Sequence, residues 1–476
     1  ICLVGSEMCI RDRHWLDVAR FGESDGILTV NEDKLRQDAW RYRDAVIRAF
    51  NSDLPWDRFV RYQFAGAPQE HAQYRPLRQF LQLGTRLQNN ADPNDKQFHL
   101  LDDMVATTGN AFLGVTFGCA RCHDHPVDPM TTEEYYRLTA VFWNQVRVEP
   151  KATRKTIPLQ IKEPRVLVAG SWASPGKAVE AGYLRALMRE PAEHWQSEGR
   201  DELDALAEWL IDVDHGAGQQ LARVIVNRLW HHHFGRGLVA SPNDFGALGE
   251  RPSHPLLLDW LAAQLIAEGW RLKPIHRLIV NSATYRQAGA TNPGQLDRDA
   301  ENRWLWHRRP LRLEAEVIRD SLLQVAGVLD HKMYGQSLFV GAYKNPVQDT
   351  PDKWRRSIYL QAHRTVRHPT LSLFDPPDRE RSDGARVTGS SPGSALFALN
   401  APLVWQLAEH FALRVQKEAG SEPAHQVERA YLLALARPPS EEELQIGLEL
   451  LASGGDRALV NYCHLLLGLN EFIYVL

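Results

Sequence analysis

The five residues Cys119-Ala-Arg-Cys122-His123 constrain this chain more than any other local feature. Two thiols three positions apart, followed at once by an imidazole, must share one short turn if they act together. This spacing is the attachment pattern of a c-type haem, because the thiols can reach the two vinyl groups on one porphyrin edge while the histidine turns onto the iron. The pattern predicts that Cys119 and Cys122 attach haem c and that His123 is an axial ligand.

A haem also needs a sixth ligand or a guarded open face. His125 and Met130 follow the motif closely, while His99 and Met104 lie on the predicted helix before it. Spacing alone does not choose between these four residues. The predicted set of metal ligands is His123, His125 and Met130.

Two other interpretations use the same segment. Cys119 and Cys122 can form a local disulfide, either structural or redox-active, with His123 tuning the thiol. Alternatively, the segment binds another divalent metal, because its thiols, imidazoles and carboxylates are the soft and hard ligands that such ions take. The ligands available to that ion are Cys119, Cys122, His123, Asp124, His125 and Asp128.

The composition excludes several classes of protein. Lys and Arg number 55 against 59 Asp and Glu, a formal net charge of -4, so no overall positive field favours nucleic acid or an acidic membrane surface. No apolar run approaches the roughly 20 residues of a membrane helix. Five cysteines are too few and too odd a number for a disulfide scaffold. We therefore expect no nucleic-acid partner and no membrane span.

The first thirteen residues, ICLVGSEMCIRDR, differ from the rest of the chain. They do not form a signal peptide, because they lack a basic start and Glu7 interrupts a short apolar stretch. They resemble a peptide translated from sequencing adapters in metagenomic reading frames. We expect residues 1–13 to be an artefact, Cys2 and Cys9 not to be native, and the export signal to be missing.

Apolar residues recur at helical spacing through most of the chain. The pattern predicts a mainly α fold of two packed helical domains with a small β element between them. The expected ranges are 14–148 for the domain with the Cys-His motif, 149–200 for a linker and 201–476 for a C-terminal companion domain. Short strands are predicted at 157–161, 165–168 and 357–361. Helices are predicted at 40–50, 56–64, 98–113, 221–234, 255–267, 273–285, 311–328, 401–416, 424–436, 441–452 and 458–473.

Weaker candidate sites lie in the second half of the sequence. The run His231–His233 ends a predicted helix, where imidazoles can cap carbonyls; a distal ligand or a catalytic base is the alternative. Glu316 and Asp320 lie four residues apart, a spacing that allows acid–base chemistry, although a surface pair between Arg312 and Glu316 explains it more simply. Cys463 lies between apolar helix positions and is expected to be buried.

Residues 14–476 resemble a family of large exported proteins of planctomycetes and related bacteria. These proteins join a cytochrome-c-like domain of unknown function to a C-terminal companion domain, also of unknown function. The resemblance to the first domain lies in HWLDVARFGESDG (14–26), WRYRDAVIRAFNSDLPWDRF (40–59) and FLGVTFGCARCHDHPVDPMTTEEYY (112–136). The resemblance to the second lies in VNRLWHHHFGRGLVASPNDFG (226–246), GWRLKPIHRLIVNSATYRQ (269–287), RRPLRLEAEVIRDSLL (308–323) and HPTLSLFDPPDRE (368–380).

The resemblance implies export to the periplasm or beyond and a haem-type role for Cys119, Cys122 and His123. It implies no established reaction, and the partner would be an unidentified redox protein or envelope component. The sequence departs from the family pattern at Pro126, Met130 and Asp383, and at residues 392–394, while the Cys-His motif is intact.

The leading hypothesis is therefore an exported c-type cytochrome-like protein with a role in electron transfer or other haem-dependent redox chemistry. One alternative is a metal-dependent hydrolase acting on polysaccharide, because 14 tryptophans offer flat faces for sugars and the carboxylates offer acid–base groups. The other is an envelope scaffold with a Cys119–Cys122 disulfide.

Overall fold

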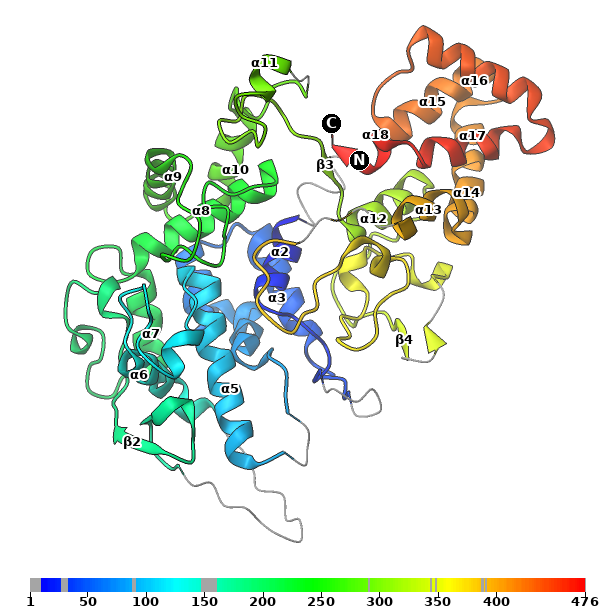
Figure 1. The fold of residues 1–476 in the computed structure, drawn as a ribbon. Coiled ribbons are helices and arrows are strands. Elements are labelled where there is room, and N and C mark those ends of the chain that lie inside the picture. The colour runs from blue at the N-terminus through cyan, green and yellow to red at the C-terminus, as the bar shows by residue number, and fades with distance from the viewer. Residues whose placement is uncertain are drawn as a thin grey trace. The chain divides into compact units, whose positions relative to one another are not determined.

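A computed structural model describes residues 10–26, 33–87, 91–146, 161–289, 292–342, 345–346, 349–386, 389 and 392–475. The fold is mainly helical, which confirms the predicted class (Figure 1). The chain divides into two compact units. The larger contains residues 14–308 and 378–385, and the smaller contains residues 309–377 and 386–476 together with the segment that ends at Arg13. The domain ranges expected from the sequence stay a prediction.

The first half of the larger unit is organised around an aromatic core. The rings of Phe59, Phe80 and Phe112 lie 5.1, 6.1 and 5.5 Å from the ring of Trp15, and all four side chains are buried. The core joins helices that are far apart in sequence to the residues just before the Cys-His motif. The helices of this half are α2 (Ile10–Val18) from His14 onward, α3 (Trp40–Asn51), α4 (Trp56–Phe64), the 3-10 helix η2 (Gln69–Gln82), α5 (Pro93–Thr108) and α6 (Thr132–Phe142).

The second half of the larger unit follows the sequence pattern closely. Helix α9 has the predicted bounds, Pro255–Ala267. Helix α8 (Gly218–Phe234) ends at Gly235, whose φ of +77° is left-handed and favours glycine at this position. Helix α10 (Leu272–Asn281) is shorter than predicted because Ser282 is already extended. The other helices are α7 (Glu202–Ile211) and α11 (Pro293–Leu296).

Strands are few, and the described residues contain three two-stranded antiparallel sheets. The hairpin of β1 (Arg165–Leu167) and β2 (Pro175–Ala178) lies where the strand at 165–168 was predicted. The prediction at 157–161 lies almost wholly outside the described residues. The other pairs are β3 (Leu311–Arg312) with β6 (Tyr474–Val475), and β4 (Gly341–Ala342) with β5 (Asn345–Pro346).

The strand predicted at 357–361 is wrong. Ser357–Tyr359 forms a 3-10 turn, in which the N–H group of Leu360 donates to the carbonyl oxygen of Ser357 at 3.0 Å. The N–H and hydroxyl groups of Ser357 donate to the carboxylate of Asp320 at 2.8 and 2.6 Å. A buried side chain, rather than a neighbouring strand, thus holds the start of this segment.

The smaller unit ends in a group of mutually packed helices, of which α15, α16 and α17 lie side by side (Figure 1). Ser440 and Glu443 form a capping box at the start of α16, and Cys463 is fully buried as expected. The predicted helix at 458–473 breaks at Gly468. The helices are α12 (Ala315–Val325), α13 (Pro392–Asn400), α14 (Pro402–Ala419), α15 (Pro423–Leu435), α16 (Glu441–Ser453), α17 (Ala458–Leu467) and α18 (Asn470–Ile473).

The surface pair predicted between Arg312 and Glu316 is not formed. Arg312 pairs with Asp375 at 3.1 Å, whereas Glu316 is buried and accepts from Arg386 at 2.7 Å and from Arg13 at 3.3 Å. Burial raises the pKa of Glu316, but the two guanidinium groups outweigh this and lower it to about 2. Arg13, the last residue of the segment expected to be an artefact, is itself buried.

No helix in the described part of the chain is both long and apolar enough to cross a bilayer.

Candidate functional site

Cys119, Cys122 and His123 lie on one exposed turn. Gly118–Arg121 forms the 3-10 helix η4, and the N–H groups of Cys122 and His123 donate to the carbonyl oxygen of Cys119 at 3.2 and 3.4 Å. Both thiols are free, and all three side chains are exposed. The turn therefore presents two thiols and one imidazole together to solvent.

Helices α5 and α6 hold this turn from beneath. Ala120 is completely buried, and the hydroxyl of Tyr136 donates to the carbonyl oxygen of Arg121 at 2.9 Å. The guanidinium of Arg121 pairs with Asp102 of α5, which also accepts from the hydroxyl of Tyr135. Burial raises the pKa of Asp102. The backbone between the two cysteines is thus fixed by buried partners, while their thiols stay outside.

Two glycines allow other segments to approach the turn closely. A Cβ on Gly109, just after α5, would collide with the ring of Phe117, which is buried directly before the motif. Gly170, in the turn of the β1–β2 hairpin, has a φ of +73°, and a Cβ there would lie 2.9 Å from Sγ of Cys122. The hairpin therefore places backbone, with no side chain, beside the second thiol.

His123 and His125 have opposite hydrogen bonds at Nδ1. For His123 the neighbour is the carbonyl oxygen of Asp124 at 2.7 Å; a carbonyl only accepts, so Nδ1 carries the proton and Nε2 keeps a free lone pair. For His125, Nδ1 accepts from the N–H group of Asp128 at 2.9 Å, which leaves the proton of the neutral ring on Nε2. That Nε2 is buried and has no hydrogen-bond partner among the described residues. Only His123 offers a ligand nitrogen without rearrangement.

Of the remaining candidate ligands, Met104 and Met130 are buried and His99 is half-buried. Met130 is buried in a loop closed by two backbone hydrogen bonds, from His125 N–H to the Met130 carbonyl oxygen at 2.8 Å and from Met130 N–H to that of Asp128 at 2.7 Å. On α5, Met104 is buried, and Nε2 of His99 lies 3.2 Å from the carbonyl oxygen of Thr85. The identity of a sixth ligand stays a prediction.

His233, the last histidine of the run at the end of α8, packs against a second histidine. The N–H group of Gly235 caps the carbonyl of His231 at 2.6 Å. Nε2 of His233 lies 2.8 Å from Nδ1 of His276 on α10. Burial lowers the pKa of His233 to about 4, and the charges of Arg308 and His14 add to the effect. His233 is therefore a neutral packing residue at ordinary pH.

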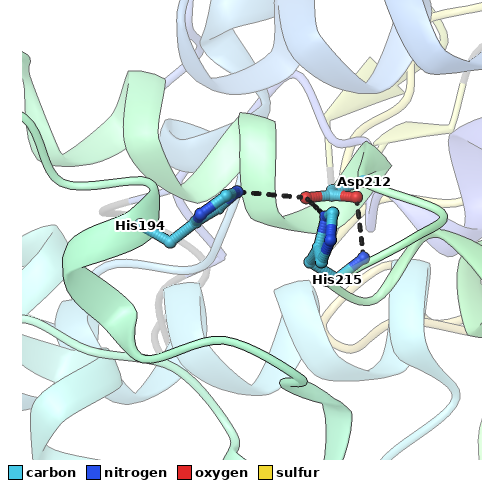
Figure 2. Close-up of side chains that lie close together, drawn as sticks. All are labelled: His194, Asp212 and His215. Atoms are coloured by element: carbon cyan, nitrogen blue, oxygen red, sulfur yellow. Dashed lines mark hydrogen bonds and ion pairs between the residues drawn. The ribbon is translucent and has the colours of Figure 1, made fainter.

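One cluster was not predicted from the sequence. His194, at the end of the 3-10 helix η8 (Ala192–His194), meets Asp212 and His215 from the loop after α7 (Figure 2). Oδ2 of Asp212 lies 3.9 Å from Nε2 of His194 and 3.8 Å from Nδ1 of His215. The pair Asp212 and His215 is visible as a local spacing, but the whole of α7 separates His194 from it in sequence.

Comparison with known proteins gives family membership without a function. No curated protein and no solved structure is significantly similar to this chain. A family profile described as a protein of unknown function, DUF1549 (PSCyt2), matches residues 10–147 and so includes the Cys-His turn. A second profile covers more than half of the chain, residues 202–451, and includes Asp212 and His215. By this match the chain belongs to the DUF1553 (PSD1) family of proteins of unknown function.

Proposed function

We propose that this protein attaches haem covalently through Cys119 and Cys122, uses His123 as an axial ligand, and acts as a c-type cytochrome-like electron-transfer protein. The observation behind the proposal is that one short exposed turn carries both free thiols and the imidazole. A bound haem iron would supply one-electron redox chemistry at this turn.

The chemistry of attachment agrees with the state of the two cysteines. In each thioether bond, the sulfur joins one carbon of a vinyl group and the thiol hydrogen goes to the other, so no oxidant or reductant is consumed. The reaction requires accessible, reduced thiols, and both cysteines are free and exposed. A Cys119–Cys122 disulfide would block it.

Glycines on and beside the turn add no side chains near the thiols. A Cβ on Gly118 would meet no atom within 4 Å, and Gly170 places no side chain beside Cys122. The Asp124 carbonyl fixes the proton of His123 on Nδ1, which is the arrangement that metal-bound histidines usually have, with the second nitrogen donating to a carbonyl or carboxylate. His123 would therefore bind through Nε2 with its ring already oriented.

Mass spectrometry of the denatured full chain, produced in a host that matures c-type cytochromes, tests the proposal. We expect the mass of one haem to remain attached after denaturation, and we expect Cys119→Ser and Cys122→Ser to abolish double attachment. Cys463→Ala is the matched control, because this thiol is buried far from the motif in sequence. Folded, soluble protein without covalent haem would overturn the proposal, and titration of its free thiols would identify the disulfide alternative.

The spectrum of the same samples tests the axial ligand. His123→Gln is expected to shift the haem absorption bands, whereas His125→Gln should leave them in place, because Nε2 of His125 carries its proton inside the loop. Unchanged bands in the His123 variant would exclude it as a ligand. Because the chain resembles exported proteins, we also propose that this function belongs to the periplasm or the cell exterior, with a redox or envelope partner.

A further inference from the structure

We propose that His194, Asp212 and His215 form a binding site for a divalent transition-metal ion, with Zn²⁺ as the best match. The ligand atoms of the three side chains all lie within 4.8 Å of one another. All three point toward a common position (Figure 2). The site is separate from the Cys-His turn and does not depend on haem binding.

The carboxylate of this cluster is held in place before any ion arrives. Oδ1 of Asp212 accepts from the N–H groups of Asp214 and His215, both at 2.9 Å. Oδ2 accepts from the indole N–H of buried Trp195 at 3.0 Å. Outer hydrogen bonds of this kind orient the ligands of metal sites. Oδ2 keeps one lone pair, and Nε2 of His194 and Nδ1 of His215 lie within 4 Å of it.

The loop that carries Asp212 and His215 has little freedom to change shape. A Cβ on Gly216 would collide with the carbonyl oxygen of Trp209, and a Cβ on Gly218 would lie 2.7 Å from the carbonyl carbon of Asp212. The two imidazoles are freer, with 43% and 45% of their side-chain surface exposed. The rigid part of the site is therefore the carboxylate, and the adjustable part is the pair of rings.

Bond lengths and ligand types favour zinc. Bonds of about 2.1 Å at tetrahedral angles place ligand atoms about 3.4 Å apart. The imidazole nitrogens now lie 3.8 and 3.9 Å from Oδ2 of Asp212 and within 4.8 Å of each other, so both rings must turn inward to bind the ion. Two imidazoles and one carboxylate suit Zn²⁺ and its neighbours in the first transition row. Ca²⁺ and Mg²⁺ need mostly oxygen ligands, and only one carboxylate is present. Three protein ligands leave a fourth position open.

Arg189 connects this cluster to a neighbouring pocket. Residues Met188 to Glu193, directly before His194, line an open pocket of about 550 Å³ together with the start of α6. Arg189 joins the wall to the metal loop, because its N–H group donates to the carbonyl oxygen of His215 at 2.8 Å and its guanidinium to that of Asp214 at 3.1 Å. An ion bridging His194 and His215 should therefore order the pocket wall.

Calorimetric titration with ZnCl₂ tests the site in the full chain. The protein carries Cys119→Ser and Cys122→Ser and is first treated with chelator, so that neither the thiols nor a retained ion can account for binding. We expect one ion per chain. His194→Ala or His215→Ala should weaken binding by about tenfold or more, and His425→Ala, which removes an exposed histidine elsewhere, should not.

Cobalt provides the second measurement. Co²⁺ bound to two imidazoles and one carboxylate should give visible absorption without the near-ultraviolet thiolate bands that a cysteine site would show. Absence of stoichiometric binding, or equal affinity in the protein with both histidines replaced, would overturn the proposal and leave His194, Asp212 and His215 as a weak ion-pair cluster. Haem attachment is measured in protein with intact cysteines, so failure of one proposal is distinguishable from failure of the other.

Discussion

The acid sensitivity of the larger unit should depend on His233. This ring lies in α8, with Nε2 2.8 Å from Nδ1 of His276 and its plane edge-on to Tyr285 at a centroid distance of 5.5 Å. Burial lowers its pKa from 6.5 to about 4. In the folded state the ring therefore stays neutral at pH values at which the unfolded chain is already protonated.

The size of the effect follows from proton linkage. A difference of about 2.5 pKa units corresponds to roughly 3.4 kcal/mol. The unfolded state binds the proton more tightly, so this stability is fully present above pH 6.5 and is lost as the pH falls from 6.5 towards 4. At pH 5 the loss from His233 alone is about 2 kcal/mol.

His233→Gln replaces the titratable imidazole with an amide that does not titrate, and it keeps a nitrogen at the position of Nε2. We expect the wild-type unit to lose about 2 kcal/mol more than the variant between pH 7.5 and pH 5. Native-state hydrogen exchange of the α8 amides measures this unit separately from the other, and His425→Gln controls for loss of an exposed histidine. Equal acid losses in the wild type and in His233→Gln would refute the conclusion that buried His233 is neutral.

Two further predictions concern the Cys-His turn. Gly170→Ala should cost about 1–2 kcal/mol from its left-handed backbone and slow alkylation of Cys122, because its Cβ would lie 2.9 Å from Sγ. Gly199 has a similar φ of +81°, and a Cβ there would meet no atom within 4 Å. Gly199→Ala should therefore cause the same backbone strain but leave Cys122 reactive. Equal alkylation rates of Cys122 in the two variants would contradict the contact between residue 170 and the thiol. Thr131→Ala removes the capping box of α6 and should lower the urea midpoint by the equivalent of about 1 kcal/mol, whereas an unchanged midpoint would show that α6 does not need its cap.

The helices were predictable where their ends are determined locally. Helix α9 begins at Pro255, and α16 (Glu441–Ser453) begins after the capping box of Ser440, so a few adjacent residues fix each boundary. The segment 357–361 shows the opposite case. Its short run of Ile, Tyr and Leu fits a strand equally well, and the 3-10 turn forms because Ser357 bonds to Asp320, a partner on another element. No local pattern contains that information.

The two candidate sites also differ in whether neighbouring residues or distant packing partners determine them. The spacing of Cys119, Cys122 and His123 already requires that they share one turn. The turn with these three residues could therefore be predicted from the sequence. The cluster of His194, Asp212 and His215 was not, because packing across α7 brings its members together. Its only local sign was the interval between Asp212 and His215, which is equally common in loops that bind nothing.

His123 and His125 show why a residue type within a motif does not by itself identify a ligand. For His125 to bind a metal through Nε2, its proton must move to Nδ1, and the hydrogen bond from the Asp128 N–H must break. Leaving a buried N–H unpaired costs about 1–3 kcal/mol, which corresponds to roughly 5- to 150-fold in affinity. His123 has no such cost, because the Asp124 carbonyl already holds its proton on Nδ1. Between these two histidines, the hydrogen-bond partner favours His123 as the ligand.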